Sequence, residues 1–205
     1  MKQETLNMLE MQEEMNTRVH DSWRDQNFEW YRAIWIECAE LMDHYGYKWW
    51  KHQEPDKAQV QLEIVDIWHF GMSCLLQNEI DQQSLALNIA SSWKEQRSDS
   101  SFREIVEALA LETLNKRTFS ISIFSELCNS ADLSFHKLYS SYVGKNVLNF
   151  FRQDNGYKEG SYKKIWSGRE DNDHLNDLLN SLDNSAANFS DMLYKALEDR
   201  YSQGC

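Results

Sequence analysis

Turn-forming residues are rare in the first two thirds of this chain. Before Gly144, its only glycines and prolines are Gly46, Pro55 and Gly71, while four of the seven glycines in the 205-residue sequence lie between Gly144 and Gly168. Sandwiches, barrels and hairpin-rich folds need frequent turn residues, so this distribution argues against an all-β fold. We therefore expect a mostly helical chain.

The long intervals without glycine or proline predict a succession of helices. Asp56 and Ser101 stand where the N-caps of two of these helices are expected. The stretch 155–172 differs in composition from its surroundings, and we expect an irregular loop there. The chain 1–205 is predicted to be a single all-α domain with helices over 4–18, 28–44, 57–77, 83–96, 102–115, 119–128, 134–152 and 174–199.

Charge and apolar runs exclude several classes of protein. The chain has 21 Lys and Arg residues against 33 Asp and Glu residues, whereas non-specific nucleic-acid binding needs a basic surface. No run approaches the ~18 apolar residues of a membrane span, and the opening segment does not resemble a signal peptide. The four cysteines lie far apart and form no CxxC motif. Their spacing therefore indicates neither a zinc site nor a disulfide framework. We expect a cytoplasmic protein that binds neither nucleic acid nor membrane.

The segment 28–45 combines two glutamates with apolar residues around nearly its whole circumference. One apolar stripe runs along it at helical spacing, and Glu37 and Glu40 share a second face with apolar residues such as Trp30 and Ile36. A helix that is apolar nearly all round is normally buried, and burying a carboxylate without a partner is costly. These two glutamates are therefore expected to have a charged partner.

The segment 57–77 repeats this pattern with Glu63 and Asp66, one helical turn apart. Antiparallel packing of the two segments would bring the four carboxylates together. Four close anions cannot all stay ionised without cations, and hard divalent ions with oxygen ligands meet that requirement. The pattern predicts a divalent-metal site, with ordinary solvated surface acids as the alternative.

His69, three residues after Asp66, introduces a rival hypothesis, a di-iron bundle that uses carboxylates and ExxH pairs. A di-iron site of this kind needs a second pair with ExxH spacing, and the sequence contains no such pair. His69 is therefore expected to be a packed or hydrogen-bonded residue.

A basic stretch runs from Lys145 to Arg169, with six cations and two anions. Lys145, Asn149 and Arg152 follow i, i+4, i+7 spacing and share one helix face. Such a face, followed by a loop rich in Gly and Lys, suits a polyphosphate, because Arg binds phosphate oxygens bidentately and Lys binds them as a point charge. The alternative is a solvated amphipathic helix.

Two amides interrupt an otherwise apolar face of the first predicted helix. Gln12 and Asn16 lie there among methionines. Buried amides need hydrogen-bond partners, and these two could pair with a nucleobase edge or with a neighbouring helix.

Four segments of the sequence contain motifs that occur together: ECAE (37–40), YKWWK (47–51), EIVDIWHF (63–70) and GKNVLNFFRQDNGYKEGSYKKIWSGREDN (144–172). In this combination they resemble the dimeric all-α dUTP diphosphatases (dUTPases), which belong to the all-α NTP pyrophosphatase superfamily. The resemblance implies a helical bundle of that type, with a mobile C-terminal loop that closes over the substrate, and a homodimer.

The resemblance also implies roles for single residues. According to the resemblance, two or three Mg²⁺ ions, for which Mn²⁺ can substitute, are held by Glu37, Glu40, Glu63 and Asp66. The uracil lies near Gln12, Asn16 and Trp49. The deoxyribose packs on Phe70, with Asp66 and Asn149 near its 3′-hydroxyl. The phosphates contact Lys145, Arg152, Tyr157, Lys164 and Asn172, and Lys158 lies in the closing loop.

The activity implied by the resemblance is Mg²⁺-dependent hydrolysis of dUTP, and of dUDP, to dUMP with release of pyrophosphate or phosphate. This reaction would clear dUTP from the nucleotide pool and supply the precursor of dTMP. Glu37 or Glu40 would accept the proton of the attacking water. Two alternatives remain open: a related nucleotide pyrophosphatase acting on dCTP or another nucleoside triphosphate, and a non-catalytic nucleotide-binding dimer.

Overall fold

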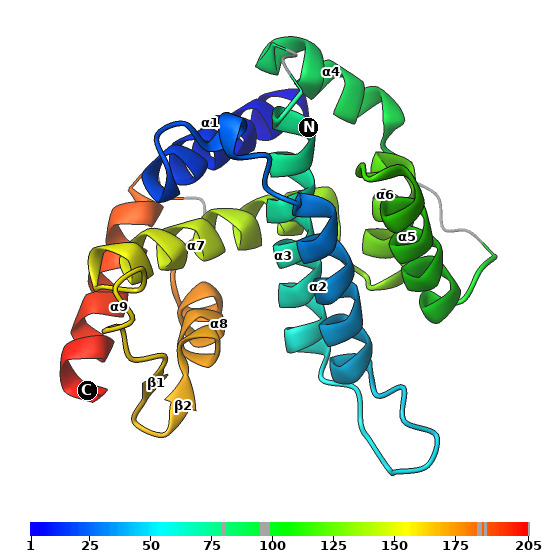
Figure 1. Ribbon diagram of the computed structural model, residues 1–205. Helices are drawn as coiled ribbons and strands as arrows, with labels where there is room; N and C mark the ends of the chain where they lie inside the picture. Colours follow the sequence, from blue (N-terminus) through cyan, green and yellow to red (C-terminus); the bar gives the residue numbers. More distant parts are fainter. Residues whose placement is uncertain (79–80, 95–98, 184–185, 187, 205) are drawn as a thin grey trace. The chain divides into compact units, whose positions relative to one another are not determined.

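The computed structural model of the chain describes residues 1–78, 81–94, 99–183, 186 and 188–204. Within these residues the chain is helical except for one short β-hairpin and the connections (Figure 1). This confirms the predicted all-α fold class. The described helices include none that combines the length and the hydropathy needed to span a membrane. The chain divides into two compact units, Met1–Tyr139 and Ser140–Cys205.

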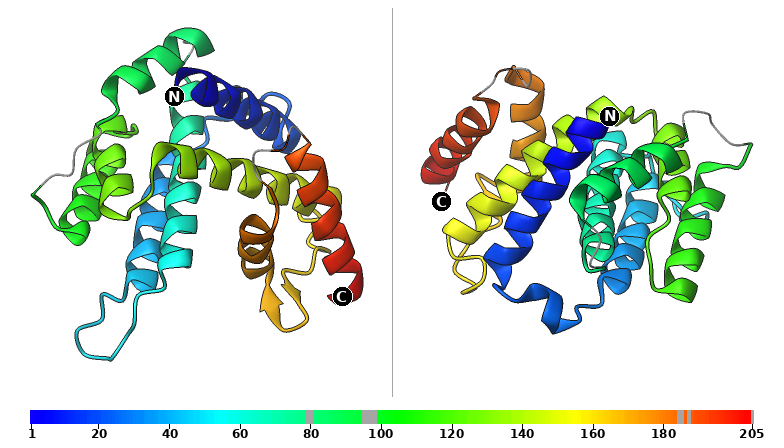
Figure 2. Two further views of the ribbon diagram at one scale, coloured as in Figure 1. Left: turned by 180° about the vertical axis from the view of Figure 1, so that it is seen from behind. Right: turned by 90° about the horizontal axis from the view of Figure 1, so that it is seen from above.

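Unit 1 is a bundle built around two antiparallel helices, α2 and α3, which run side by side and are joined by the connection 46–56 (Figures 1 and 2). Helix α1 packs against α3 and α4, and α5 packs against α2 and α6. The elements of this unit are α1 (Lys2–Val19), the 3₁₀ turn η1 (Trp23–Gln26), α2 (Trp30–Tyr45), α3 (Lys57–Leu76), α4 (Gln82–Ser92), α5 (Phe102–Lys116), α6 (Ile121–Ser130) and the start of α7 (Phe135–Asp154).

Helix α3 is buried on most of its circumference, as its apolar sequence predicts. Its Trp68 is fully buried and stacks on Phe124, with ring centroids 5.0 Å apart, while Trp93 meets Trp68 edge-on. Gly71 allows Phe119 to approach α3 closely, because a Cβ atom at position 71 would lie 2.7 Å from that ring. These aromatic rings therefore form part of the core of unit 1.

Helix α2 differs from the expectation that it is buried nearly all round. Ile34, Cys38 and Leu41 are buried, but Trp35 is 40 % exposed and Ile36 is 46 % exposed. The prediction is wrong for these two side chains because α2 packs against α3 and α5, and these helices, within the described residues, leave Trp35 and Ile36 uncovered.

Unit 2 contains the rest of α7, the strands β1 (Ile165–Trp166) and β2 (Arg169–Glu170), and the helices α8 (Asp171–Ser181) and α9 (Phe189–Gly204). The two strands pair antiparallel across a two-residue turn in which Ser167 and Gly168 have positive φ values of 48° and 79°. This is the type I′ geometry that suits a tight hairpin. The expected irregular loop is therefore partly an ordered hairpin, and its buried Trp166 packs against Phe151.

Two predicted helices end earlier than expected. The single helix predicted over 174–199 is two helices, because Leu182 is extended (φ −91°, ψ 149°) after α8. The helix predicted over 83–96 ends at Ser92, and residues 95–96 lie outside the described residues.

Both predicted N-caps are confirmed. The Asp56 side chain accepts hydrogen bonds from the backbone of Ala58 and Gln59. Ser101 forms a capping box with Glu104. These caps set where α3 and α5 begin.

Candidate active site

Three of the four predicted carboxylates gather where α2 and α3 pack. Oxygen atoms of Glu37, Glu63 and Asp66 all lie within 4.8 Å of one another. Glu63 is 6 % exposed, and Glu37 and Asp66 are half-buried. Glu40 is exposed and is not part of this group, hereafter the carboxylate group.

The crowding of the carboxylate group changes the acidity of its members. Burial, and then the charges of Asp66 and Glu63, raise the pKa of Glu37 to about 9. In the chain alone, this crowding therefore favours the protonated form of Glu37. A cation placed among these oxygens would remove the repulsion that causes this shift.

The donor set fits a hard divalent ion. All three members of the carboxylate group offer oxygen, which Mg²⁺ and Mn²⁺ prefer. The nearest soft donor in sequence, Cys38, is buried, and burial raises the pKa of its thiol to about 12. It is therefore no thiolate ligand at neutral pH.

His44 is a neighbour of the carboxylate group that sequence reasoning missed. Its Nε2 lies 3.5 Å from Oε1 of Glu63. The sequence spacing could have indicated this position. His44 follows Glu37 by seven residues and so lies about 20° from it around a helix of 3.6 residues per turn.

The two amides predicted near the base form a buried network between α1 and α3. Gln12 Nε2 donates to Asn16 Oδ1 and to Ser73 Oγ, each over 3.0 Å, and Asn16 Nδ2 donates to Ser73 Oγ over 3.1 Å. His69 Nδ1 donates to Gln12 Oε1 over 2.8 Å. His69 is thus buried and hydrogen-bonded, as expected, and the amides pair with a neighbouring helix in the chain alone.

The structure does not bring Trp49 to these amides. Trp49 lies on the connection between α2 and α3, at the opposite end of the helix pair from α1, and is 89 % exposed (Figure 1). Phe70 is half-buried, and its ring centroid lies 6.3 Å from that of Trp30. The indole Nε1 of Trp30 is buried and has no hydrogen-bond partner among the described residues.

In unit 2, three residues predicted to contact phosphate form one hydrogen-bonded cluster with Asn149, which is predicted to lie near the 3′-hydroxyl. Lys145 Nζ donates to Asn172 Oδ1 over 3.0 Å. Arg152 donates to Asn149 Oδ1 over 3.2 Å and to Asn172 Oδ1 over 3.4 Å. Tyr157 lies beside them, with its ring 5.9 Å from the Arg152 guanidinium. We call Lys145, Asn149, Arg152 and Asn172 the basic cluster.

The two remaining predicted cations lie outside the basic cluster. Lys164 pairs with Glu170 over 3.1 Å, and Lys158 is exposed. Two residues that sequence reasoning missed, Tyr162 and Asp171, contact Arg152 or its partner. The sequence could have indicated Asp171, because it is an acid directly before Asn172 and next to a basic stretch.

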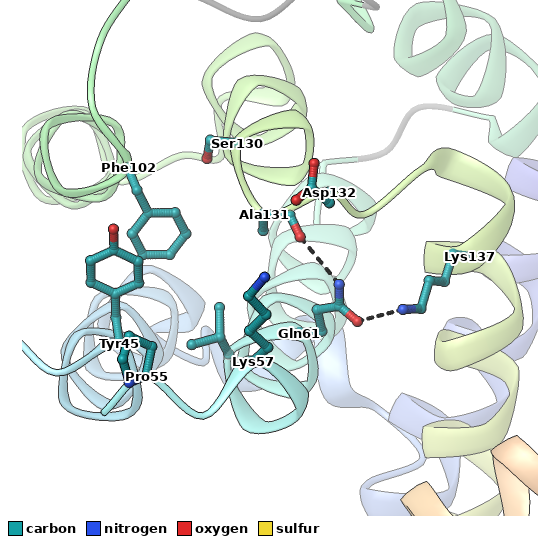
Figure 3. A pocket seen from close by; sticks show the side chains of 10 residues that line it. Tyr45, Pro55, Lys57, Gln61, Phe102, Ser130, Ala131, Asp132 and Lys137 are labelled. Atoms are coloured by element: carbon teal, nitrogen blue, oxygen red, sulfur yellow. Dashed lines mark hydrogen bonds between the residues drawn. The ribbon is translucent and has the colours of Figure 1, made fainter. Parts of the chain in front are cut away.

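Unit 1 also contains a pocket of about 430 Å³ between the ends of α2, α3, α5 and α6 (Figure 3). Tyr45 and Phe102 stack on one side of it, and Gln61 donates to the carbonyl of Ala131 and accepts from Lys137. Gln61, which contributes to its lining from α3, lies on the other side of that helix from Glu63 and Asp66, and neither of these carboxylates lines the pocket. This pocket is therefore separate from the carboxylate group.

A comparison with known families finds a match along most of the chain. The model of a family described as dUTPase matches residues 4–157, which are 154 of the 205 residues. The matched range includes α2, α3 and the whole of α7, and it ends before the hairpin. No curated protein matches the chain.

Proposed function

The chain belongs to the all-α dUTPase family and is a dUTP diphosphatase, and on this premise we propose that it hydrolyses both dUTP and dUDP in a Mg²⁺-dependent reaction at the carboxylate group. Water adds to a phosphorus atom of the substrate, and the products are dUMP and pyrophosphate from dUTP, or dUMP and phosphate from dUDP. The observation that carries the proposal is the convergence of Glu37, Glu63 and Asp66.

The carboxylates have two tasks in this proposal. Glu37, Glu63 and Asp66 hold the metal through oxygen, joined by Glu40, which stands one helical turn after Glu37. When bound, two or three Mg²⁺ ions supply polarisation of the phosphate oxygens and activation of water. Glu37 or Glu40 accepts the proton of the attacking water.

The sugar and base are proposed to contact unit 1 residues. Phe70 packs on the deoxyribose, and Trp30 beside it offers a buried Nε1 donor that lacks a partner among the described residues. Gln12, Asn16 and Trp49 recognise the uracil, and Asp66 and Asn149 contact the 3′-hydroxyl.

The phosphates are proposed to contact the basic residues of unit 2. These residues neutralise the polyphosphate locally, which a chain of net charge −12 requires. The segment 155–172, which includes the hairpin and the first two residues of α8, closes over the phosphates and excludes water. The residues proposed to bind phosphate are Lys145, Arg152, Tyr157, Lys158, Lys164 and Asn172.

A substrate panel tests this function. Turnover of dUTP, dUDP, dCTP, dTTP and UTP is measured with Mg²⁺, with Mn²⁺ and with EDTA, and the products are separated by chromatography. We expect dUMP from dUTP and dUDP, activity with either metal, and none in EDTA. Full activity in EDTA would overturn the metal site, and faster turnover of dCTP would identify a pyrophosphatase of different base specificity. Binding without any turnover would identify a non-catalytic nucleotide-binding protein.

In the cell, the proposed role is to remove dUTP from the nucleotide pool and to supply the precursor of dTMP. We propose that the enzyme acts as a cytoplasmic homodimer and that residues 1–205 form a single functional domain.

A further inference from the structure

Asp171 is a buried acid at the centre of the basic part of unit 2. Its side chain is 0 % exposed, and it stands at the first position of α8. Both of its oxygens bind Arg152: Nε donates to Oδ2 and Nη2 donates to Oδ1, each over 2.8 Å. The hydroxyl of Tyr162 donates to Oδ2, also over 2.8 Å. Asp171 therefore receives three hydrogen bonds, two of them charge-assisted.

Asp171 occupies the edge of the Arg152 guanidinium that Nε and Nη2 form. Nη1 faces other groups of the basic cluster. Nη1 donates to Asn149, and Nη2 also reaches Asn172. Lys145 donates to the same Asn172 oxygen. A bidentate pair fixes the plane of a guanidinium as well as its position. The rest of the basic cluster is thereby arranged around an Arg152 that cannot rotate freely.

We propose that Asp171 is the positioning residue of the phosphate site, holding Arg152 by one edge so that its other edge, together with Lys145, meets the polyphosphate. This inference rests on the proposed function, in which Arg152 binds phosphate. Tyr162 supports Asp171 by holding Oδ2.

Two explanations of Asp171, positioning of Arg152 and simple charge balance, predict opposite effects of its removal on polyphosphate binding. Asp171 carries a negative charge beside two cations, Lys145 and Arg152. If charge alone mattered, removing that carboxylate would strengthen the binding of a polyanion. If Asp171 acts by fixing the guanidinium, its removal weakens binding, because the donors are no longer pre-organised.

The test compares Asp171→Asn with the control Asp177→Asn in isothermal titration calorimetry, using the non-hydrolysable analogue α,β-imido-dUTP and Mg²⁺. Asp177 also lies on α8 and pairs with arginines, Arg169 over 2.8 Å and Arg200 over 3.3 Å, but it is half-exposed and outside the basic cluster. We expect Asp171→Asn to weaken analogue binding about tenfold or more, and Asp177→Asn to leave it unchanged.

Steady-state kinetics and rescue complete the test. Asp171→Asn should raise KM for dUTP more than it lowers kcat, and Asp171→Glu should recover part of the loss because it keeps the carboxylate. Unchanged or tighter analogue binding in folded Asp171→Asn would overturn the inference, as would an equal loss in Asp177→Asn. An unmodified chain that neither binds the analogue nor hydrolyses dUTP would instead overturn the proposed function.

A melting curve shows whether Asp171→Asn folds. If it does not, Tyr162→Phe takes its place, since it removes one hydrogen bond from Asp171 and leaves the pair with Arg152 intact. We expect analogue binding about threefold weaker in that variant, and unchanged binding would overturn the inference.

Discussion

Glu63 and Glu40 occupy different surroundings although both are proposed metal ligands. Glu63 is 6 % exposed and lies among Glu37, Asp66 and His44. Glu40 is exposed and outside the carboxylate group. The same substitution at the two positions therefore separates the effect on metal binding from the effect on stability.

Glu63→Gln should lower kcat/KM with Mg²⁺ by about 100-fold or more, because a metal ligand is lost. In EDTA the same variant should melt at a higher temperature than the unmodified chain, since one of three crowded carboxylates is removed. Glu40→Gln should lower activity with little change in melting temperature. Thermal melting in EDTA and initial rates in Mg²⁺ measure both effects. A fully active Glu63→Gln would show that the carboxylate group is not the metal site.

Phe70 tests how the sugar is read. An aromatic ring packed on the deoxyribose leaves no space for a 2′-hydroxyl, and rejection of that group is worth about 2–3 kcal/mol, or roughly 30- to 150-fold in relative kcat/KM. Phe70→Ala should lower dUTP turnover and narrow the dUTP/UTP ratio. The control is Phe28→Ala, which also removes a ring beside Trp30, 5.4 Å between centroids. An unchanged ratio in folded Phe70→Ala would mean that Phe70 is only a packing residue.

The buried pair of Asp171 and Arg152 predicts a pH dependence of stability. Burial opposes ionisation of Asp171, but hydrogen bonds and charge from Arg152 outweigh it and hold the pKa of this carboxyl below its ordinary value of 3.8. A folded pKa below the unfolded one stabilises the fold above the unfolded value. This contribution should be constant near neutral pH and lost as the pH falls below 3.8. Urea unfolding of the unmodified chain and Asp171→Asn from pH 7 to pH 3 measures the difference, which should shrink only at the acid end.

At the scale of elements, the hairpin of β1 and β2 determines how α8 begins. The backbone N–H of Asp171 donates to the carbonyl of Lys164 over 2.9 Å, across the base of the hairpin. The turn that closes it needs two consecutive residues with positive φ, a conformation that glycine adopts readily and other residues adopt at a cost. The backbone geometry just before Asn172 of the basic cluster thus depends on Ser167 and Gly168.

Gly168→Ala should destabilise the fold by about 1 kcal/mol, since an L-residue is strained in the left-handed region. The melting temperature should fall by about 2–4 °C. Ser167→Asn is the matched control of opposite sign, because Asn-Gly is a preferred pair for a type I′ turn, and it should keep or raise the melting temperature. A Gly168→Ala variant as stable as the unmodified chain would contradict the role given to this turn.

At the scale of the whole molecule, the single chain leaves large apolar side chains exposed on its helices. On α2 these are Trp35 and Ile36, and on α5 they are Leu111 and Leu114, which are 61 % and 45 % exposed and one helical turn apart. Contiguous exposed apolar surface commonly marks an interaction site. A second copy of the chain is the partner that the proposed homodimer provides.

Sedimentation equilibrium at micromolar concentration should give twice the chain mass of 24.3 kDa. Leu111→Glu combined with Leu114→Glu should shift the mass toward one chain, because charges would then lie in the apolar surface. Leu87→Glu is the control, a single exposed leucine on α4, and should leave the mass unchanged. A mass near 24.3 kDa for the unmodified chain would refute the homodimer.

Local pattern determined much of this protein in advance. Helical periodicity and rare turn residues predicted the helices of unit 1, and side-chain oxygens at Asp56 and Ser101 marked two helix starts. The spacing of Glu37, Glu40, Glu63 and Asp66 on two apolar helices predicted that four carboxylates would meet, and three of them, all but Glu40, do so. Each of these inferences depends on residues within a few turns of one another, or on one antiparallel pairing.

Tertiary structure alone decided the contacts between distant residues. The bond from Gln12 to Ser73 spans 61 positions, and the pair of Arg152 and Asp171 spans 19. No period of 3.6 or 2 residues encodes such partners, because they depend on which helices pack and at what rotation. For the same reason the sequence indicated that α2 is apolar nearly all round, and only packing showed that Trp35 and Ile36 stay exposed while the apolar side with Ile34 is covered.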